Sequence, residues 1–422
     1  MKNNNDENQW LGVIPNDWKL IKGKYLFKQR SEKGNNFELQ LLSPTQKYGI
    51  IPQSLYEKLS GFSAVKLDEK TDFNTLKTIH KGDYCISLRS FQGGLEYSEY
   101  EGVCSPAYQI FFPIVKLCTK YYKYLFKVQC FIDKINSFTL SLRDGKNIAF
   151  ADFASTYLPY PPLDIQEKIA DFLDKECSEI DALHTDIEKQ IETLEEYKKS
   201  IITEAVTKGL DPDVEMKDSG IEWVGMIPKH WNVTKFKYIC SVKTNLVNVK
   251  KYQEYPQISP DNIEKDSGIL LNYSTVAEVG VISDNHLFFK GQILYSKIRP
   301  KLNKATIAPF NGLCSADMYP IETNENTMFV LYMILSQYFL NQVSLVTEDR
   351  VKMPKINQEE LGVIKIVLPD NINEQEKIVL YLHQKCQDIS KAIEEKKEQL
   401  ETLEQYKKSL IYEYVTGKKE VK

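Results

Sequence analysis

The sequence predicts an α/β (α+β) fold in which two modules, arranged as a pseudo-symmetric repeat, are separated by two long α-helices that form an antiparallel coiled coil. Three observations predict this fold: motifs recur about 210 residues apart, two segments carry a seven-residue apolar period, and the other segments alternate short extended runs with turns. A chain of 422 residues also exceeds what one hydrophobic core usually organises. We therefore expect two modules with separate cores.

The internal repeat covers nearly the whole chain. Its clearest matches are 10–18 (WLGVIPNDW) with 223–231 (WVGMIPKHW), 166–169 with 375–378 (both QEKI), and 194–200 (LEEYKKS) with 403–409 (LEQYKKS). The helical parts are the more alike, whereas the modules share apolar, Gly and Trp positions and differ between them. Two related scaffolds that bind different ligands would show this pattern, and duplication followed by neutral drift is the alternative.

Two segments show the heptad period of a coiled coil. The apolar positions that recur every seven residues are Ile180, Ile187, Leu194 and Ile201 in the first copy and Leu382, Ile389, Leu403 and Leu410 in the second. Lys396 interrupts the second series. Asp164 and Asn371 are the predicted N-caps, and Gly209 and Gly417 lie near the predicted helix ends.

The modules have a different period. The predicted extended segments are 84–88, 109–112, 292–296 and 364–368, bounded by Gly, Asn and Pro. Each module also has one predicted short helix, at 121–135 and 329–343, followed by a loop that carries Arg143 or Arg350. Mixed modules joined by helical spacers are the expected architecture.

Charge is unevenly distributed although the net charge is only -4. Residues 1–163 hold 21 Lys+Arg against 16 Asp+Glu, whereas residues 164–220 hold 7 against 17. A polyanion would meet the modules and be repelled by the first helix, although so small an excess is a weak electrostatic signal. The apolar runs are short and the N-terminus is polar, so we expect a cytoplasmic protein without membrane contact.

Catalytic and cofactor-binding signatures are missing. The sequence has no GxxxxGK[ST], GxGxxG, HExxH or (Asn/Asp)-Pro-Pro-(Tyr/Phe) motif, and its eight cysteines form no CxxC pair. Asp213, Glu215 and Lys217 are residue types of metal-dependent nucleases, but they stand too close together in a linker. We expect free thiols, no metal, no bound cofactor and no catalysis by this chain alone.

Two loops in each module combine Arg or Lys with Ser, Gln, Asn and Gly, which suits the reading of base edges. The candidate DNA-binding residues are Ser87, Arg89, Ser90, Gln92, Arg143, Lys146, Ser296, Lys297, Arg299, Lys301, Arg350 and Lys352. Ordinary solvated loop charge is the alternative for each of them, and recurrence at matched positions favours Arg143 and Arg350. For the tryptophans at 10, 18, 223 and 231, core or module-to-helix packing is favoured over base stacking.

These motifs resemble the specificity subunit of type I restriction-modification systems. The resemblance rests on 218–231 (DSGIEWVGMIPKHW), on the Leu-Pro to QEKI transitions of both copies, and on the repeated LExYKKS. It implies target recognition domains at 1–160 and 211–368, with conserved helical spacers at 161–210 and 369–422.

The resemblance also implies a function. Each module would read one half of a bipartite site in double-stranded DNA, and the helices would fix the gap and dock two methyltransferase subunits that methylate adenine N6 with S-adenosylmethionine. Restriction/translocase subunits would join them, using ATP and Mg. Since the modules differ, we expect an asymmetric site.

Two alternative functions stay open for this chain. One is a coiled-coil scaffold whose modules bind proteins, and the other is a self-contained methyltransferase or nuclease.

Overall fold

The computed structural model describes residues 10–33, 39–63, 75–86, 94–138, 148–347 and 354–421. The chain divides into two compact units. The first comprises Met1–Asp186 with Glu398–Lys422, and the second comprises Ile187–Lys397. Each unit therefore contains one module and one part of each long helix.

The module of the first unit is built on a sheet of strand order β2-β9-β6-β7, accompanied by the pairs β1-β10, β3-β4 and β5-β8. Its strands are β1 Lys19–Lys22, β2 Phe27–Gln29, β3 Leu42–Thr45, β4 Gly49–Pro52, β5 Lys77–Ile79, β6 Tyr84–Ile86, β7 Glu96–Tyr97, β8 Gly102–Cys104, β9 Gln109–Pro113 and β10 Tyr157–Tyr160. Its helices are α1 Gly23–Leu26, α2 Gln53–Ser60, α3 Thr119–Leu125, α4 Gln129–Asn136 and α5 Phe150–Ser155. Phe27, Phe111, Phe126 and Phe153 are buried together at the centre of its core.

The module of the second unit has a four-stranded sheet, β14-β22-β19-β20, and a five-stranded sheet, β15-β18-β21-β16-β17. Its strands are β11 Met216–Asp218, β12 Met226–Pro228, β13 Asn232–Lys235, β14 Cys240–Val242, β15 Leu246–Val247, β16 Pro256–Ile258, β17 Ser274–Thr275, β18 Asn285–Phe288, β19 Ile293–Ser296, β20 Ala305–Ile307, β21 Gly312–Cys314, β22 Met318–Thr323 and β23 Lys365–Leu368. Its helices are α7 Phe236–Ile239, η2 Val249–Lys251, η3 Pro260–Asn262, α8 Val276–Val279, η4 Pro300–Leu302, α9 Thr327–Leu335, α10 Gln337–Thr347 and α11 Gln358–Val363. The predicted extended segments lie on β6, β9, β19 and β23, which confirms them for the described residues.

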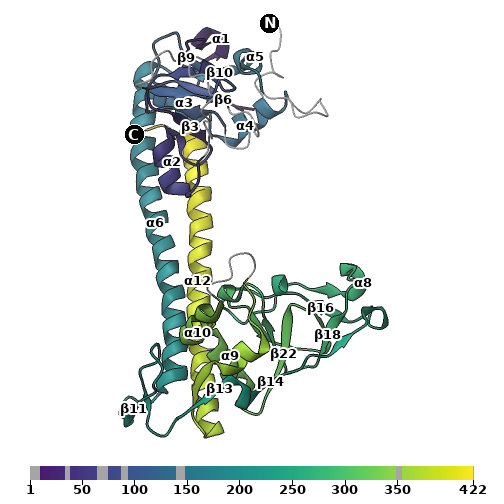
Figure 1. Cartoon of the computed structure of the whole chain (residues 1–422). Helices are drawn as coiled ribbons and strands as arrows, with labels where there is room; N and C mark the ends of the chain where they lie inside the picture. Colours follow the sequence, from purple (N-terminus) through teal and green to yellow (C-terminus); the bar gives the residue numbers. More distant parts are fainter. Residues whose placement is uncertain are drawn as a thin grey trace. The chain divides into compact units, whose positions relative to one another are not determined.

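The two predicted long helices are α6, Leu163–Lys208, and α12, Ile372–Val415. Within each unit the two helices lie side by side and run in opposite chain directions (Figure 1). Residues 181, 190 and 198 of α6 contact residues 407, 396 and 390 of α12, so the residue numbers rise on one helix as they fall on the other. The heptad residues of both series are buried or half-buried. The predicted antiparallel coiled coil is confirmed.

Polar contacts along the helix pair differ between its two ends. In the first unit, Lys407 donates to Asp181 at 2.6 and 2.7 Å, whereas in the second unit the repeat-equivalent Lys198 donates to the hydroxyl of Ser390 at 2.9 Å. Lys396, which interrupts the heptad series, donates to Gln190 Oε1 at 2.5 Å. Polar groups thus enter the seam with a partner on the opposite helix.

The helix ends confirm three of the four predicted boundary residues. Asn371 precedes α12 and its Oδ1 accepts from the Asn373 amide at 3.0 Å. Gly209 and Gly417 end the two helices with φ of 73° and 70°. The N-cap predicted at Asp164 is wrong, because α6 begins at Leu163 and the carbonyl of Pro162 accepts from the amides of residues 165 and 166. A proline already has a helical φ and has no N–H to satisfy, so a helix can start directly after it.

Each single short helix predicted in the modules is in fact two helices. In the first module α3 and α4 are separated at Val128, which is extended (φ -73°, ψ 140°), and in the second α9 and α10 are separated at Ser336 (φ -70°, ψ 151°). Residues on both sides of each break are buried in the same core. The apolar pattern therefore continues through the break, and the periodicity cannot reveal it.

The repeated motif glutamines join each long helix to its module. Gln166 and Gln375 are completely buried. The Oε1 of Gln166 accepts from the Cys118 amide at 2.9 Å, at the start of α3, and the Oε1 of Gln375 accepts from the Asn326 amide at 3.0 Å, at the start of α9. Their Nε2 atoms donate to the carbonyls of the preceding proline segments. These contacts explain why the glutamine of QEKI recurs at both junctions.

The tryptophans pack as predicted, with one exception. Trp18 and Trp231 are buried against the end of a long helix, and Trp10 meets the Phe131 ring edge-on with centroids 5.6 Å apart. Trp223 is 39% exposed, so it is not a core residue, and module-to-helix packing stays a prediction for it.

Substituting Gly417 by alanine is expected to destabilise the first unit by about 2 kcal/mol. An added Cβ would lie 2.4 Å from Cδ of Pro15, and φ is +70°. Gly220 has a similar φ of +65° and nothing within 4 Å of its Cβ position. Gly220→Ala therefore isolates the backbone cost, about 1 kcal/mol, and equal losses in urea unfolding would contradict the predicted clash.

Candidate nucleic-acid interface

In the second module, strand β19 leads directly into one of the predicted loops, residues 297–304. Lys297 is half-buried, with Nζ 5.2 Å from the centroid of the Tyr319 ring, while Arg299 and Lys301 are exposed. Ser296 is only 3% exposed, and its hydroxyl donates to the Ile298 carbonyl at 3.0 Å. Ser296 therefore shapes this loop, and its hydroxyl does not face outward as a ligand contact would require.

The backbone of loop 297–304 is tightly specified. Arg299 and Asn303, on either side of η4, both have a φ of 46°, in the left-handed region that non-glycine residues seldom adopt. The last lysine of the loop, Lys304, is held inward, since its Nζ donates to the Pro260 carbonyl at 2.8 Å. Arg299 and Lys301 are thus presented outward from a fixed turn.

The second predicted loop of this module meets the first. The Arg299 amide donates to the Pro354 carbonyl at 2.9 Å, and the Ile356 amide donates to the Lys297 carbonyl at 3.0 Å. Residue 354 directly follows the segment 348–353, which contains Arg350 and Lys352. Two stretches about 50 residues apart in sequence are therefore paired where the candidate cations occur.

The first module places the ends of its two predicted loops together in the same way. Ile86, the last residue of β6, pairs with Gln109 of β9. The Gln109 side chain donates to the Ile148 carbonyl at 2.8 Å and accepts from the Phe150 amide at 2.7 Å. The end of β6 thus adjoins the point at which the chain returns from 139–147.

Eight of the twelve predicted site residues lie outside the described residues: Ser87, Arg89, Ser90, Gln92, Arg143, Lys146, Arg350 and Lys352. Their predicted contacts stay predictions. The four described ones, Ser296, Lys297, Arg299 and Lys301, belong to one strand end and its loop.

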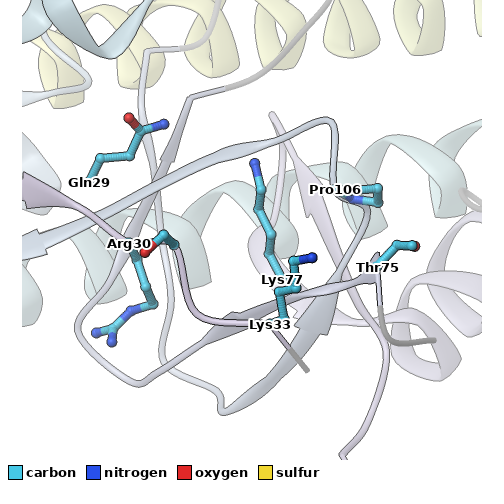
Figure 2. A pocket seen from close by; sticks show the side chains of 7 residues that line it. Gln29, Arg30, Lys33, Thr75, Lys77 and Pro106 are labelled. Carbon is cyan, nitrogen blue, oxygen red and sulfur yellow. The ribbon is translucent and has the colours of Figure 1, made fainter. Parts of the chain in front are cut away.

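A basic pocket in the first module was missed by the sequence reasoning. This cavity of about 490 Å³ is lined by Gln29, Arg30, Ser31, Lys33, Thr75, Lys77 and Pro106, and Figure 2 shows these side chains around it. The stretch 28–33, KQRSEK, mixes Arg and Lys with Gln and Ser, which is the criterion that selected the other loops. Its cation Lys77 comes from β5, and only the fold brings it next to Lys33.

The pocket arginine is committed to an internal ion pair. Arg30 donates to both carboxylate oxygens of Asp83 at 2.7 and 2.9 Å, and its guanidinium carbon lies 4.3 Å from the centroid of the Phe112 ring. Burial opposes protonation, but the hydrogen bonds and charge of Asp83 raise the pKa of Arg30 above its ordinary value. Arg30 therefore shapes the wall. Lys33 and Lys77 supply the positive charge, although the Nζ of Lys77 also donates to the Tyr108 carbonyl at 2.7 Å.

A buried ion pair stands beside the first predicted loop of the same module. Glu96 of β7 is 1% exposed and both its oxygens accept from Lys127 Nζ at 2.7 Å. Burial raises the pKa of the Glu96 carboxyl to about 7, against the attraction of Lys127.

This pKa predicts a pH effect on stability. Because the folded state holds the Glu96 proton more tightly than the unfolded chain, the contribution is full below the unfolded pKa of 4.5 and is lost as pH rises through about 7. Wild type is expected to lose about 2–3 kcal/mol more than Glu96→Gln between pH 5 and pH 8 in urea unfolding. Glu99→Gln, at an exposed partner of Lys123, is the control. Parallel pH profiles for wild type and Glu96→Gln would refute the effect.

The described residues contain no cluster of metal-ligating side chains. Over those residues, no group of three or more His, Cys, Asp or Glu side chains is placed to hold a metal ion. All eight cysteines are free. No single helix in the described ranges is long and apolar enough to span a membrane, although the bent pair α9–α10 reaches that length and composition.

Comparison with known proteins gives consistent similarities. The family model described as the type I restriction modification DNA specificity domain matches residues 15–193 and 228–402. The specificity subunit of the Escherichia coli type I restriction enzyme EcoDI is 31% identical over 245 residues, which is 54% of each chain, so the match spans about half of that relative. The MjaVIII specificity subunit of Methanocaldococcus jannaschii is 28% identical over 306 residues, 68% of each chain.

Two solved structures share the fold. A chain from a study of complex assembly and conformational transition of the type I R-M system superposes with a TM-score of 0.69 at 13% identity, covering 96% of this chain and 98% of that one. The HsdS subunit from Thermoanaerobacter tengcongensis gives a TM-score of 0.52, also at 13% identity, with the same coverage.

Proposed function

The chain belongs to the family of type I restriction-modification DNA specificity proteins, and we propose that it is the subunit that selects the DNA sequence in such a system. Each module reads one half of a bipartite duplex site. The modules correspond to 1–160 and 211–368, and the helical spacers at 161–210 and 369–422 set the gap between the half-sites. The chain itself performs no catalysis and binds no cofactor.

One observation carries this proposal: in both modules, the ends of two separate polar loops adjoin at the end of equivalent strands, β6 and β19. Duplication alone would preserve the scaffold. It would not require loops of different sequence to be held at the same position, as two readers of different half-sites do. Exposed side chains such as Arg299, on a loop whose backbone is held by hydrogen bonds, suit base-edge reading in the major groove.

The chemistry belongs to partner subunits in this proposal. Two methyltransferase subunits, which carry S-adenosylmethionine, dock on the helices and methylate adenine N6 after flipping the base. Restriction/translocase subunits use ATP and Mg to translocate and cut unmodified DNA. The complex works in the cytoplasm, away from membranes.

Mapping methylated adenines in the host genome by single-molecule sequencing tests the proposal. We expect one split motif whose two halves differ in sequence, since loop 297–304 and its counterpart at 88–95 share few residues. Deletion of the gene should remove that methylation. A motif that persists after deletion would refute the function, and a perfect inverted repeat would refute the asymmetry.

The pocket lysines are expected to contact phosphates. Substituting Lys33 and Lys77 by alanine should weaken binding to all duplexes alike and reduce the slope of log K against log salt by about 1 for each lysine. Lys19→Ala with Lys116→Ala, also in the first module, is the charge-matched control. A change in the preferred motif without a change in slope would contradict this assignment.

A further inference from the structure

In both modules, the end of the loop that follows β6 or β19 meets the break between two helices. Phe126 lies at the end of α3 and Leu335 at the end of α9, and the two residues are equivalent at the repeat spacing of 209. Carbonyl groups at the end of a helix lack intrahelical partners. Each break therefore offers a buried acceptor at the same position.

In the second module this acceptor is used by a side chain. Asn303 is 2% exposed, and its Nδ2 donates to the Leu335 carbonyl at 3.1 Å. η4, the middle of loop 297–304, packs against α10 on the other side of the break. The loop that presents Arg299 and Lys301 is thus hydrogen-bonded to the end of α9 through Asn303 and packed against α10 through η4.

The first module uses the same acceptor with different groups. The Leu95 amide lies 3.4 Å from the Phe126 carbonyl oxygen, and a Cβ on Gly94 would lie 2.1 Å from that oxygen. Lys127, which follows Phe126, donates to the buried carboxylate of Glu96, which follows Leu95. Because different residues make an equivalent attachment in the two modules, the attachment itself is the shared feature.

We propose that Asn303 is a positioning residue for half-site reading: by tying loop 297–304 to the α9–α10 break, it fixes the orientation from which Arg299 and Lys301 meet DNA. The Gly94–Glu96 segment does the same at the α3–α4 break. Neither Asn303 nor Glu96 touches DNA. This inference rests on the proposed function and adds to it the source of loop rigidity.

The test uses the full-length chain assembled with its methyltransferase subunits and a duplex library with a randomised 25-base-pair region. Asn303→Asp keeps the shape and left-handed tolerance of asparagine but replaces the donor by an acceptor facing a carbonyl. Asn303→Gly keeps the positive φ without adding charge. Asn311→Asp is the matched control, since the Oδ1 of Asn311, in the same module, accepts from the Lys290 amide at 2.8 Å and a carboxylate keeps that acceptor.

Both Asn303 variants are expected to enrich a motif whose second-module half is degenerate, with discrimination at its base pairs reduced about tenfold or more. The first-module half and the salt slope should stay as in wild type, and Asn311→Asp should match wild type throughout. Glu96→Gln and Lys127→Met should relax the other half-site instead.

Two results would overturn the inference: unchanged enrichment at both half-sites, or equal loss at both, which is what general unfolding produces. Melting temperatures of each variant accompany the selection. A wild-type complex that enriches no motif would overturn the proposed function itself, and the positioning role with it, so the two failures are distinguishable.

Discussion

Trp231→Ala is expected to lower the free energy of unfolding of the second unit by about 3–5 kcal/mol, the range for removing a fully buried large aromatic side chain. Trp231 is completely buried, its ring centroid lies 6.5 Å from that of Phe329, and its Nε1 donates to Glu374 Oε1 at 2.9 Å. The substitution therefore leaves a cavity between the module and both long helices. It also removes a hydrogen bond to a charged group.

The measurement is urea unfolding of the purified chain, with hydrogen exchange to assign the loss to Ile187–Lys397. Trp223→Ala supplies the control within the same motif, because Trp223 is 39% exposed and should cost under about 1 kcal/mol. Trp231→Phe should recover most of the packing and lose mainly the hydrogen bond. If both alanine variants were equally stable, the repeated tryptophan would not join module to helix.

Arg299→Ala is expected to reduce discrimination at one base pair of the second-module half-site about 10- to 100-fold, corresponding to about 1–3 kcal/mol. Arg299 is exposed, and its backbone is fixed by a left-handed φ of 46° and by a hydrogen bond to Pro354. A guanidinium reads a guanine edge through two parallel donors, which an ammonium does not reproduce. Arg299→Lys should therefore keep the salt slope and still lose the discrimination.

Competition binding on the selected duplex and its single-base variants measures this effect. Lys290→Ala is the control, because Lys290 is exposed beside the opposite end of β19. Equal weakening on every duplex would identify Arg299 as a phosphate contact. Unchanged affinity and unchanged base preference would show that loop 297–304 does not contact the bases.

The candidate site was only partly predictable. Arg299 and Lys301 stand out because they lie beside small and polar residues directly after an apolar run, and they are indeed exposed. Ser296 met the same criterion, but as the last residue of β19 it is buried, and its hydroxyl donates to the Ile298 carbonyl. Lys33 and Lys77 are 44 residues apart, so no local pattern joins them.

The sequence by itself determined the doubled architecture, the antiparallel helix pair and the glycine helix ends, because these depend on local period, repeat spacing and backbone conformations that single residues favour. Only the tertiary structure decided where α3 is separated from α4 and α9 from α10, why a glutamine recurs at each junction between module and helix, and which loop ends meet. Those features depend on contacts between residues far apart in the chain. Breaking a helix frees a carbonyl, and only the folded core places Asn303 or Leu95 near enough to use it.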